Sequence, residues 1–307
     1  MRALVTGGNG FMGSHLVEGL HREGWDVVSV HRGVALHHAP ARVRVIREGI
    51  GNRGAMAEAL RGVDVVFHLA WSGVHVSSNQ DLRGHVEANL LPSLSLFETC
   101  LEAGVRRIVF VSSGGTVYGR PETLPIPEDH PTRPINAYGA TKLAVERYLD
   151  LHRHLQGLET VILRPSVAYG ERQRPDGLQG AVAVFLGRIA RGEPLVIWGD
   201  GSSSRDFFHV EDFVHAASLA GTAPVSGEVF NISGGRGLRL DTLVDLLQEV
   251  SGRKAEVRFE PARVFDVPVL ELDLKRAQQL LGWQPKIDFE EGLARTWEWL
   301  KEQDFGG

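Results

Sequence analysis

The chain has 307 residues, of which 43% are hydrophobic and 23% charged, and its formal net charge is -5. This length can bury a substantial core in one large or two smaller domains. The mild acidity gives no overall basic field for nucleic acid, and no run of about 18 apolar residues could cross a membrane. A small-molecule ligand is therefore the favoured kind of partner.

Cysteine and histidine usage bears on the compartment and on metals. Cys100 is the single cysteine, so the chain forms no intrachain disulfide and no cysteine-based metal site. The start, "MRALVTGG", enters a predicted strand at once and carries no signal-peptide h-region. The thirteen histidines show no ligand spacing such as HExxH. We expect a cytoplasmic protein without a metal site.

The first half alternates short β-branched runs with helical patterns. The predicted strands are "RALVT", "DVVSV", "RVRVI", "DVVFHLA" and "RIVFVSS", and the predicted helices begin at Gly10 and lie near 54–61 and 85–103. Apolar strands separated by helices indicate parallel βαβ units, in which both faces of each strand are covered. The sequence therefore predicts an α/β fold with a doubly wound parallel sheet.

The second half has a looser pattern. A helix over 136–155 leads into strand "ETVILRP", a further strand is predicted at "PLVIWGDG", and "DFFHVEDFVHAASLA" is predicted to be helical. The end alternates helix and strand in smaller units, "RLDTLVDLLQEVSG", "AEVRFEP" and "LKRAQQLLGW". We predict a first domain over 1–165, which also takes in parts of 200–232, and a smaller second domain over 166–307.

A glycine-rich turn follows the first predicted strand. In "VTGGNGFMGSHLVEGL", Gly7, Gly10 and Gly13 have GxxGxxG spacing between that strand and an amphipathic helix. Glycines here allow a tight turn, close approach of a pyrophosphate to backbone N–H groups, and close packing of helix on strand. An ordinary glycine-rich βα turn is the alternative. The position favours a dinucleotide site.

The end of the second strand normally carries the acidic residue that binds the adenosine ribose of NAD. In "VVSVHRG", His31 and Arg32 stand there instead. A basic pair would suit the 2′-phosphate of NADP, because a guanidinium matches phosphate oxygens. A solvated loop that accepts either cofactor is the alternative, so both NAD and NADP stay open.

Tyr138 and Lys142 are four residues apart in "NAYGATKLAVERYL" and share one helix face. A free phenol, with a pKa of about 10, is a poor base at neutral pH, and a neighbouring ammonium favours its phenolate form. Alone, such a pair is more typical of surface packing. Behind a dinucleotide turn and βαβ units, it indicates catalysis.

With this pair in place, the chain resembles an extended short-chain dehydrogenase/reductase of the nucleotide-sugar epimerase/dehydratase kind, similar to the UDP-glucose 4-epimerases. The matching motifs run nearly end to end: "TGGNGFMG", "DVVFHLA", Asn89, "EAGVRRIVFVSS", "VYG", "YGATK", "LRPSVAYG", "WGDGSSSRDFFHVEDFVHA", "NISGG" and "LGWQPKIDFEEGL". The resemblance implies a Rossmann dinucleotide-binding domain, a second domain that holds a nucleoside-diphosphate sugar, and a homodimer.

The resemblance also implies roles for residues. Tyr138 takes a sugar hydroxyl proton while hydride passes to the nicotinamide, and Lys142 steadies both. Arg205 matches an arginine that contacts the substrate diphosphate; Arg263 matches a second one less securely, because Phe265 replaces the usual small residue. A surface ion pair is the alternative for each arginine, and packing is the alternative to base stacking for Trp198. Further cofactor contacts are implied for Phe11, Met12, Leu69, Ala70, Asn89 and Pro165.

The turn "SSGGTVYG" departs from the family pattern. The hydroxyl partner of the catalytic tyrosine should stand at Gly114. Ser113 and Thr116 are the alternatives, and a water in place of any hydroxyl is the third. Gly115 and Thr116 also replace the acidic pair of the 4,6-dehydratases, which argues against dehydration. Val167 replaces a substrate-contacting asparagine, and 49–51 lacks the acid that contacts adenine.

Three functions follow from these residues. The first is an epimerase that acts through a transient 4-keto sugar, with hydride held on a nicotinamide cofactor. The second is an NADPH-dependent reductase of a keto sugar nucleotide or another carbonyl compound, suggested by His31 and Arg32. The third is a non-catalytic dinucleotide sensor, suggested by Gly114. For a dimer, helices near 85–103 and 137–155 would form the interface, although their apolar residues also suit packing on the sheet.

Overall fold

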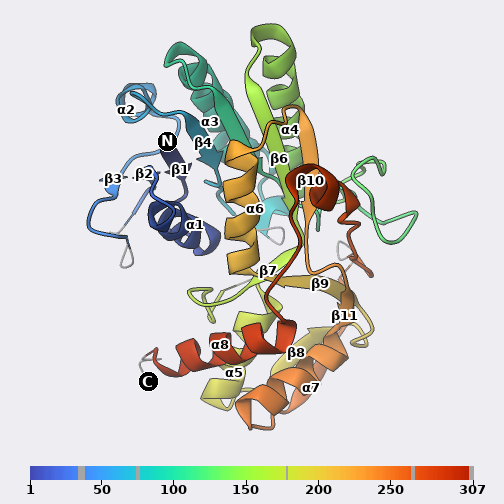
Figure 1. The fold of residues 1–307 in the computed structure, drawn as a ribbon. Coiled ribbons are helices and arrows are strands. Elements are labelled where there is room, and N and C mark those ends of the chain that lie inside the picture. Colours follow the sequence, from blue (N-terminus) through green and yellow to red (C-terminus); the bar gives the residue numbers. More distant parts are fainter. Residues whose placement is uncertain (34–38, 74–76, 178, 264–266, 304–307) are drawn as a thin grey trace.

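A parallel seven-stranded sheet forms the centre of the molecule (Figure 1). The computed structural model describes residues 1–33, 39–73, 77–177, 179–263 and 267–303. The sheet has the order β10-β6-β5-β4-β1-β2-β3. The strands are β1 (Arg2–Thr6), β2 (Asp26–Val30), β3 (Arg44–Ile46), β4 (Val65–His68), β5 (Arg107–Val111), β6 (Glu159–Pro165) and β10 (Glu228–Ile232).

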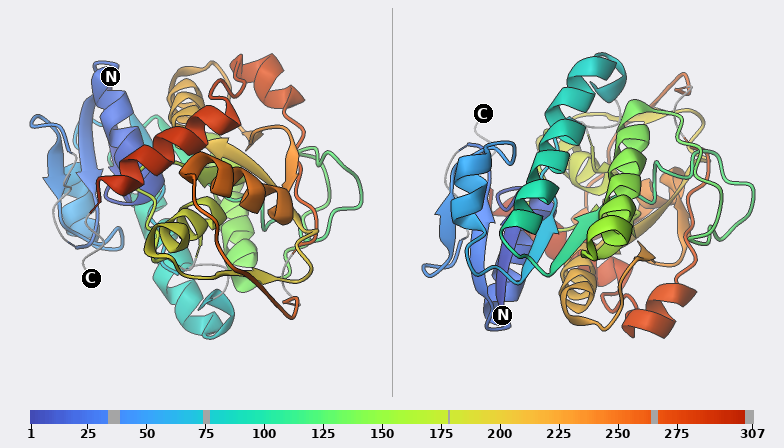
Figure 2. Two further views of the ribbon diagram at one scale, coloured as in Figure 1. Left: turned by 90° about the horizontal axis from the view of Figure 1, so that it is seen from below. Right: turned by 90° about the horizontal axis from the view of Figure 1, so that it is seen from above.

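Helices cover both faces of this sheet, which explains why its strands are apolar throughout. Every residue of β4 and β5 is buried. One face is covered by α1 (Phe11–Arg22) and α6 (Val210–Thr222). The other is covered by α2 (Arg53–Ala59), α3 (Leu82–Glu102) and α4 (Ala137–Gln156), and α3 and α4 lie side by side (Figure 2). The predicted doubly wound α/β fold is confirmed.

Chain from beyond residue 200 returns to the sheet. β10 pairs in parallel with β6, with Phe230 opposite Leu163, and α6 packs against α1. The predicted division into domains at residue 165 stays a prediction. No helix in the described ranges is both long enough and apolar enough to span a bilayer.

The remaining elements lie beneath the carboxyl ends of the strands (Figure 1). Three strands pair in the order β11-β9-β7, and two pair as β12-β8. Helices α5, α7 and α8 pack against these strands, and together they form a separate apolar core. The bounds are β7 (Val167–Tyr169), α5 (Ala181–Arg191), β8 (Leu195–Trp198), β9 (Ser204–His209), β11 (Gly237–Arg239), α7 (Leu240–Ser251), β12 (Val257–Glu260) and α8 (Phe289–Lys301).

The predicted helix over "DFFHVEDFVHAASLA" is wrong in its first four residues. Asp206–His209 belong to β9, whose Phe207 and Phe208 are buried and pair with β7. The helix begins only at Val210, where His209 Nδ1 accepts a hydrogen bond from the Glu211 amide at 3.3 Å. Strand pairing on both edges of β9 thus outweighs the helical spacing of the sequence. The helix predicted at "LKRAQQLLGW" is a π-helical turn over Ala277–Leu281.

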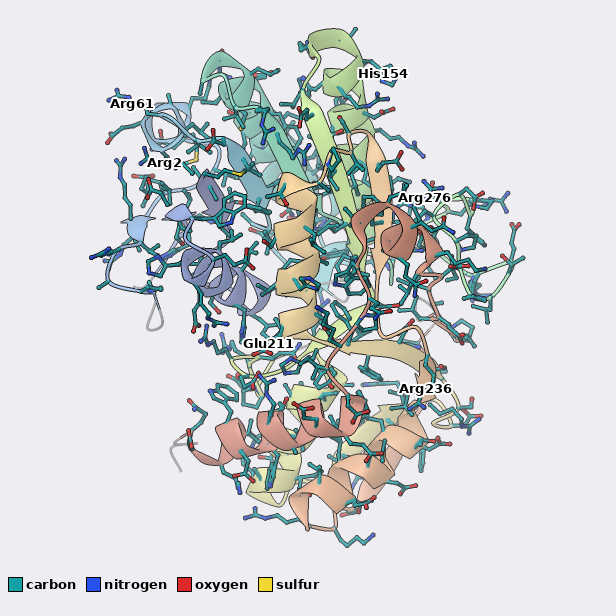
Figure 3. The ribbon with its side chains drawn as sticks, in the orientation of Figure 1. Arg2, Arg61, His154, Glu211, Arg236 and Arg276 are labelled. Atoms are coloured by element: carbon teal, nitrogen blue, oxygen red, sulfur yellow. The ribbon has the colours of Figure 1, made fainter. Side chains whose placement is uncertain are left out.

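Ion pairs and a hydrogen bond join the helices α6 and α1 to the lower part of the molecule. Glu211 lies at the lower end of α6, facing α8 (Figure 3). It accepts a hydrogen bond from Arg295 of α8 at 2.6 Å, and Arg295 also pairs with Glu171 at 3.1 Å. The Glu171 carbonyl accepts from His15 of α1 at 2.8 Å. These contacts fix α8 relative to the helix that follows the glycine turn.

Candidate active site

The glycine turn between β1 and α1 requires its glycines. Gly7 has a φ of +73°, and a Cβ there would lie 2.9 Å from the Ala70 backbone. A Cβ on Gly13 would collide with the Gly7 carbonyl oxygen. Gly10 caps α1 without a side-chain hydrogen bond, so the first amides of the helix, at Phe11 and Met12, have no side-chain cap. This is the arrangement that receives a pyrophosphate.

A cavity of about 240 Å³ continues from this turn along the carboxyl ends of β2 and β4. The loop after β4 forms one wall, where the Leu69 and Ala70 amides donate to Thr6 Oγ1 at 3.1 Å. Other lining residues are Gly7, Asn9, His31, Arg32, Gly49, Trp71, Ser72 and Pro92. A glycine cradle beside a polar cavity fits the pyrophosphate and adenosine of a dinucleotide.

His31 and Arg32 both line this cavity, and their surroundings differ. His31 is 4% exposed, and both of its ring nitrogens lack a hydrogen-bond partner among the described residues. Burial and the charge of Arg47 lower the pKa of His31, so its imidazole is neutral at neutral pH. Arg32 reaches across the cavity to Ser72 Oγ. A neutral imidazole offers one donor and one acceptor, which suits ribose hydroxyls.

Helix α4 brings Tyr138 and Lys142 to the same place. Asn136 caps the helix by accepting from the Gly139 amide at 2.8 Å, and Ser78 Oγ accepts from the Tyr138 amide at 3.1 Å. Lys142 Nζ lies 5.7 Å from the centre of the Tyr138 ring. The shared helix face predicted for the pair is therefore present in the structure.

The ammonium of Lys142 is buried. The residue is 2% exposed, and Nζ donates to the Val111 carbonyl at 2.7 Å, at the end of β5. Burial lowers the pKa of Lys142 well below its usual value, and the negative charge of Glu146 opposes this shift. Burial also raises the pKa of Tyr138 to about 12. The tyrosine therefore depends on nearby positive charge to ionise at neutral pH.

The turn after β5 explains the missing hydroxyl at Gly114. The Gly114 amide donates to the Pro165 carbonyl at 2.8 Å. A Cβ at Gly114 would lie 2.5 Å from Leu272 Cδ1 and 2.9 Å from the Arg164 carbonyl oxygen. A side chain here requires the Leu272 side chain and the Arg164 backbone to shift, so packing disfavours a serine.

Thr116 and Ser113, the two alternatives, differ in their surroundings. A Cβ on Gly139 would lie 2.6 Å from the Thr116 carbonyl oxygen, so Thr116 packs against the first turn of α4, next to Tyr138. Thr116 Oγ1 is buried and has no hydrogen-bond partner among the described residues. Ser113 is half-buried, and its carbonyl accepts from the Val117 amide at 3.2 Å within the turn.

The predicted substrate residues lie in the lower part of the molecule. Arg205 is half-buried on β9, opposite Leu238 of β11. Arg263 follows β12, and its guanidinium lies 5.2 Å from the centre of the Trp198 ring. Trp198 is 42% exposed, so its ring is not a core element. Phe265 lies outside the described residues.

Sequence reasoning missed three residues at the site: Trp71, Ser72 and His85. Trp71 follows Leu69 and Ala70 directly, and its ring contacts the rings of Tyr138 and His85 at 5.9 and 6.1 Å between centres. The signal was the tryptophan at the end of "HLAW", at a carboxyl end of the sheet. His85 had no such signal.

Both polar atoms of the Asn89 side chain form hydrogen bonds within the protein. Its Oδ1 accepts from the Ser72 amide at 2.7 Å, and its Nδ2 donates to the Ser72 and His85 carbonyls at 3.1 and 2.9 Å. In the structure, Asn89 thus fixes the cavity wall that follows β4. A direct cofactor contact of Asn89 stays a prediction.

Comparison with known proteins agrees with this site. The model of the NAD dependent epimerase/dehydratase family matches residues 3–233. A UDP-glucose 4-epimerase from Mycolicibacterium smegmatis is 36% identical over 99% of both chains. The crystal structure of UDP-glucose 4-epimerase from Thermotoga maritima with UDP-glucose superimposes with a TM-score of 0.94 at 36% identity, covering 98% of this chain and 99% of that one.

A third similar protein carries the cofactor. The UDP-glucose 4-epimerase of Thermus thermophilus, in complex with NAD, has a TM-score of 0.92 and 33% identity, with 98% and 99% of the two chains covered. The chain therefore belongs to the NAD dependent epimerase/dehydratase family. The resemblance inferred from the sequence is confirmed.

Gly114→Ser should destabilise the protein and should not raise its activity. The new Cβ meets the Arg164 backbone, and overpacking of this kind costs about 1–3 kcal/mol. Gly115→Ala is the matched control, because a Cβ there meets only Leu270 Cδ2 at 3.5 Å and Ser113 Oγ at 4.0 Å. Thermal unfolding compares the two variants. Equal midpoints, or a more active Gly114→Ser, would contradict the packing argument.

NAD should bind at least about tenfold more tightly than NADP, a difference of about 1.4 kcal/mol. The neutral His31 brings no charge to a 2′-phosphate, and the Arg32 guanidinium donates a hydrogen bond to Ser72 Oγ. Titration calorimetry of both cofactors on the cofactor-free protein measures the ratio. Equal or tighter binding of NADP would contradict this account and favour the reductase.

Proposed function

We propose that the protein is an NAD-dependent UDP-hexose 4-epimerase that interconverts the two configurations at carbon 4 through a transient 4-keto sugar. The observation that carries the proposal is the placement of Tyr138 and Lys142 on one helix face, beside the glycine cradle and its cavity. The relatives named UDP-glucose 4-epimerase, which match along nearly the whole chain, support UDP-hexoses as the substrate class.

Each protein group has a chemical task in this proposal. NAD, when bound, supplies the hydride acceptor. Tyr138 acts as a phenolate that removes the proton of the 4-hydroxyl and later returns it. Burial alone raises the pKa of Tyr138 to about 12, so the phenolate needs a stabilising group. In this proposal the buried charge of Lys142 is that group. Regeneration of the cofactor within one cycle is compatible with tight binding.

Thr116 is our proposed hydroxyl partner for the reaction. It packs on the first turn of α4, and its Oγ1 is buried without a protein partner in the described part of the chain. Buried hydroxyls normally have a partner, so a substrate oxygen is a natural acceptor or donor. Ser113 stays the alternative. Gly115 and Thr116 leave no acid pair, which argues against dehydration.

The lower part of the molecule is proposed to hold the nucleoside diphosphate. Arg205 and Arg263 are guanidiniums suited to bidentate contacts with phosphate oxygens. The exposed face of Trp198 gives the uracil ring a platform for stacking. Val167 offers no hydrogen bond from its side chain, so these arginines would carry most of the recognition.

Tyr138→Phe should abolish epimerisation. Incubation of the purified protein and NAD with UDP-glucose, followed by NMR, should show conversion to UDP-galactose for the wild type only. Loss of a general base costs about 10²–10⁴-fold. Unchanged UDP-hexoses in the wild-type reaction would refute the epimerase, and full turnover by Tyr138→Phe would support another base.

In the same assay, Thr116→Val and Ser113→Ala separate the two hydroxyls. We expect Thr116→Val to lower kcat by about tenfold or more, and Ser113→Ala to have little effect, since a hydrogen bond to a charged group is worth about 1.5–3 kcal/mol. The reverse order would assign the role to Ser113. Equal, small effects would leave water as the partner.

We also propose a homodimer formed by α3 and α4, in a cytoplasmic protein. On α4, Tyr148, Leu151 and Leu155 are 41%, 48% and 67% exposed and, with Ala140 and Ala144, follow helical spacing along one face. Leu91 on the adjacent α3 is 53% exposed. A second copy that packs the same two helices against this face would bury the stripe.

Sedimentation should give a mass close to twice 33.7 kDa. The double variant Leu91→Glu/Leu151→Glu should sediment as a monomer, because it places charge in the proposed interface. Leu280→Glu is the control, since Leu280 is 47% exposed and lies on the π-helical turn instead. A monomeric wild type, or a double variant that stays dimeric, would refute this interface.

A further inference from the structure

The buried ammonium of Lys142 has an unusual set of neighbours. Within the described ranges, no carboxylate lies within ion-pair distance of Nζ. Glu146, one turn further along α4, is already paired with Arg164 at 2.6 Å and accepts from Ser112 Oγ. The ammonium has three N–H donors, and the Val111 carbonyl accepts from one of them at 2.7 Å.

Aromatic rings take the place that a carboxylate would normally fill. Nζ lies 3.7 Å from the centre of the Trp71 ring and 4.9 Å from that of Phe110. A cation over an indole face is stabilised by the ring quadrupole, and most strongly when it is desolvated, as Lys142 is. Trp71 is therefore the nearest aromatic partner of the buried charge, beside the Val111 carbonyl.

Trp71 also contacts the other members of the site. Its ring packs against Tyr138 at an interplanar angle of 65° and against Phe110 at 47°. It lines the cavity proposed for the dinucleotide. Its Nε1–H is buried without a hydrogen-bond partner among the described residues, so the indole has no competing polar anchor.

We propose that Trp71 is a positioning residue that holds Lys142 charged and in place through its π face. This inference rests on the proposed roles of Tyr138 and Lys142. An aromatic face stabilises the ammonium without neutralising it. With one N–H donated to the Val111 carbonyl and one directed at the Trp71 ring, the third N–H is left for the ribose of the bound cofactor, and the positive charge is left for the phenolate of Tyr138. A carboxylate would cancel that charge.

Other titratable groups near this contact do not supply the charge. His68 of β4 and His85 of α3 both face Lys142, and burial together with the Lys142 charge lowers the pKa of each, that of His68 to about 3. Both are therefore neutral at neutral pH. Arg164 is paired with Glu146. Among the described groups, Lys142 is therefore the positive charge that the proposal assigns to Tyr138.

Trp71→Leu and Trp71→Phe test the inference, because leucine keeps apolar bulk and phenylalanine keeps the π face. The phenolate is the active form, so kcat/KM falls as pH drops through the pKa of Tyr138. When the ring no longer stabilises the Lys142 charge, the phenolate loses its positive neighbour and the pKa of Tyr138 rises. We expect the acid limb to move up by about one pH unit in Trp71→Leu, a tenfold loss at a fixed lower pH. Trp71→Phe should keep the acid limb and the kcat/KM close to those of the wild type.

A second readout is the Kd of NAD, measured by calorimetry. It should rise about tenfold in Trp71→Leu and little in Trp71→Phe. A tetrafluorinated tryptophan at position 71 changes the ring quadrupole with little change in shape, so it tests the idea even where Trp71→Leu does not fold. Trp299→Leu, at a half-buried tryptophan of α8, controls for general loss of packing.

The outcomes are distinct. An unmoved acid limb with unchanged Kd in Trp71→Leu, or a wild-type profile in the fluorinated protein, would overturn the role of Trp71. Phenylalanine as damaging as leucine would also overturn it, because shape or the N–H group would then matter instead. Unchanged UDP-hexoses in the wild-type reaction would instead refute the proposed function, whatever the Trp71 variants show.

Discussion

The site depends on one costly condition, a lysine ammonium held in the interior without an ion-pair partner among the residues that the structure describes. Burial favours the neutral forms of both Lys142 and Tyr138, yet the proposed chemistry requires the charged form of each. Three kinds of group partly offset the cost of burying the ammonium. They are the Val111 carbonyl at the end of β5, the distant charge of Glu146, and the faces of the Trp71 and Phe110 rings. Each of these groups stabilises the ammonium and none neutralises it by contact, and in our proposal its charge acts on the tyrosine.

Close packing at the carboxyl edge of the sheet forms the rest of the site. Gly7 and Gly13 let α1 and the loop after β4 approach the turn, and Gly114 lets the turn after β5 lie on the Arg164 and Pro165 backbone. At position 114 this close packing disfavours the hydroxyl side chain that the family resemblance implies. A nearby hydroxyl, with Thr116 favoured by its burial and its contact with α4, takes over the task in our proposal.

Much of this was predictable from the sequence. The βαβ alternation, the glycine turn and the spacing of Tyr138 and Lys142 are local patterns, and local patterns survive folding. The strand over Asp206–His209 was missed because pairing with β7 and β11 decides it, and those partners are distant in sequence. The pKa of His31 and the position of Trp71 depend on burial and on contacts between elements, which one sequence does not display. Gly114 was noticed as a departure, but its cause lies in Leu272 and Arg164, far along the chain.

The central claim is that hydride leaves carbon 4 of a UDP-hexose and returns to the same carbon without exchange with water. The most direct measurement uses UDP-glucose that carries deuterium at carbon 4, incubated with the protein and NAD in ordinary water. The account predicts UDP-galactose that keeps its deuterium at carbon 4, seen by NMR. Product with hydrogen at that carbon, or no product at all, would contradict it.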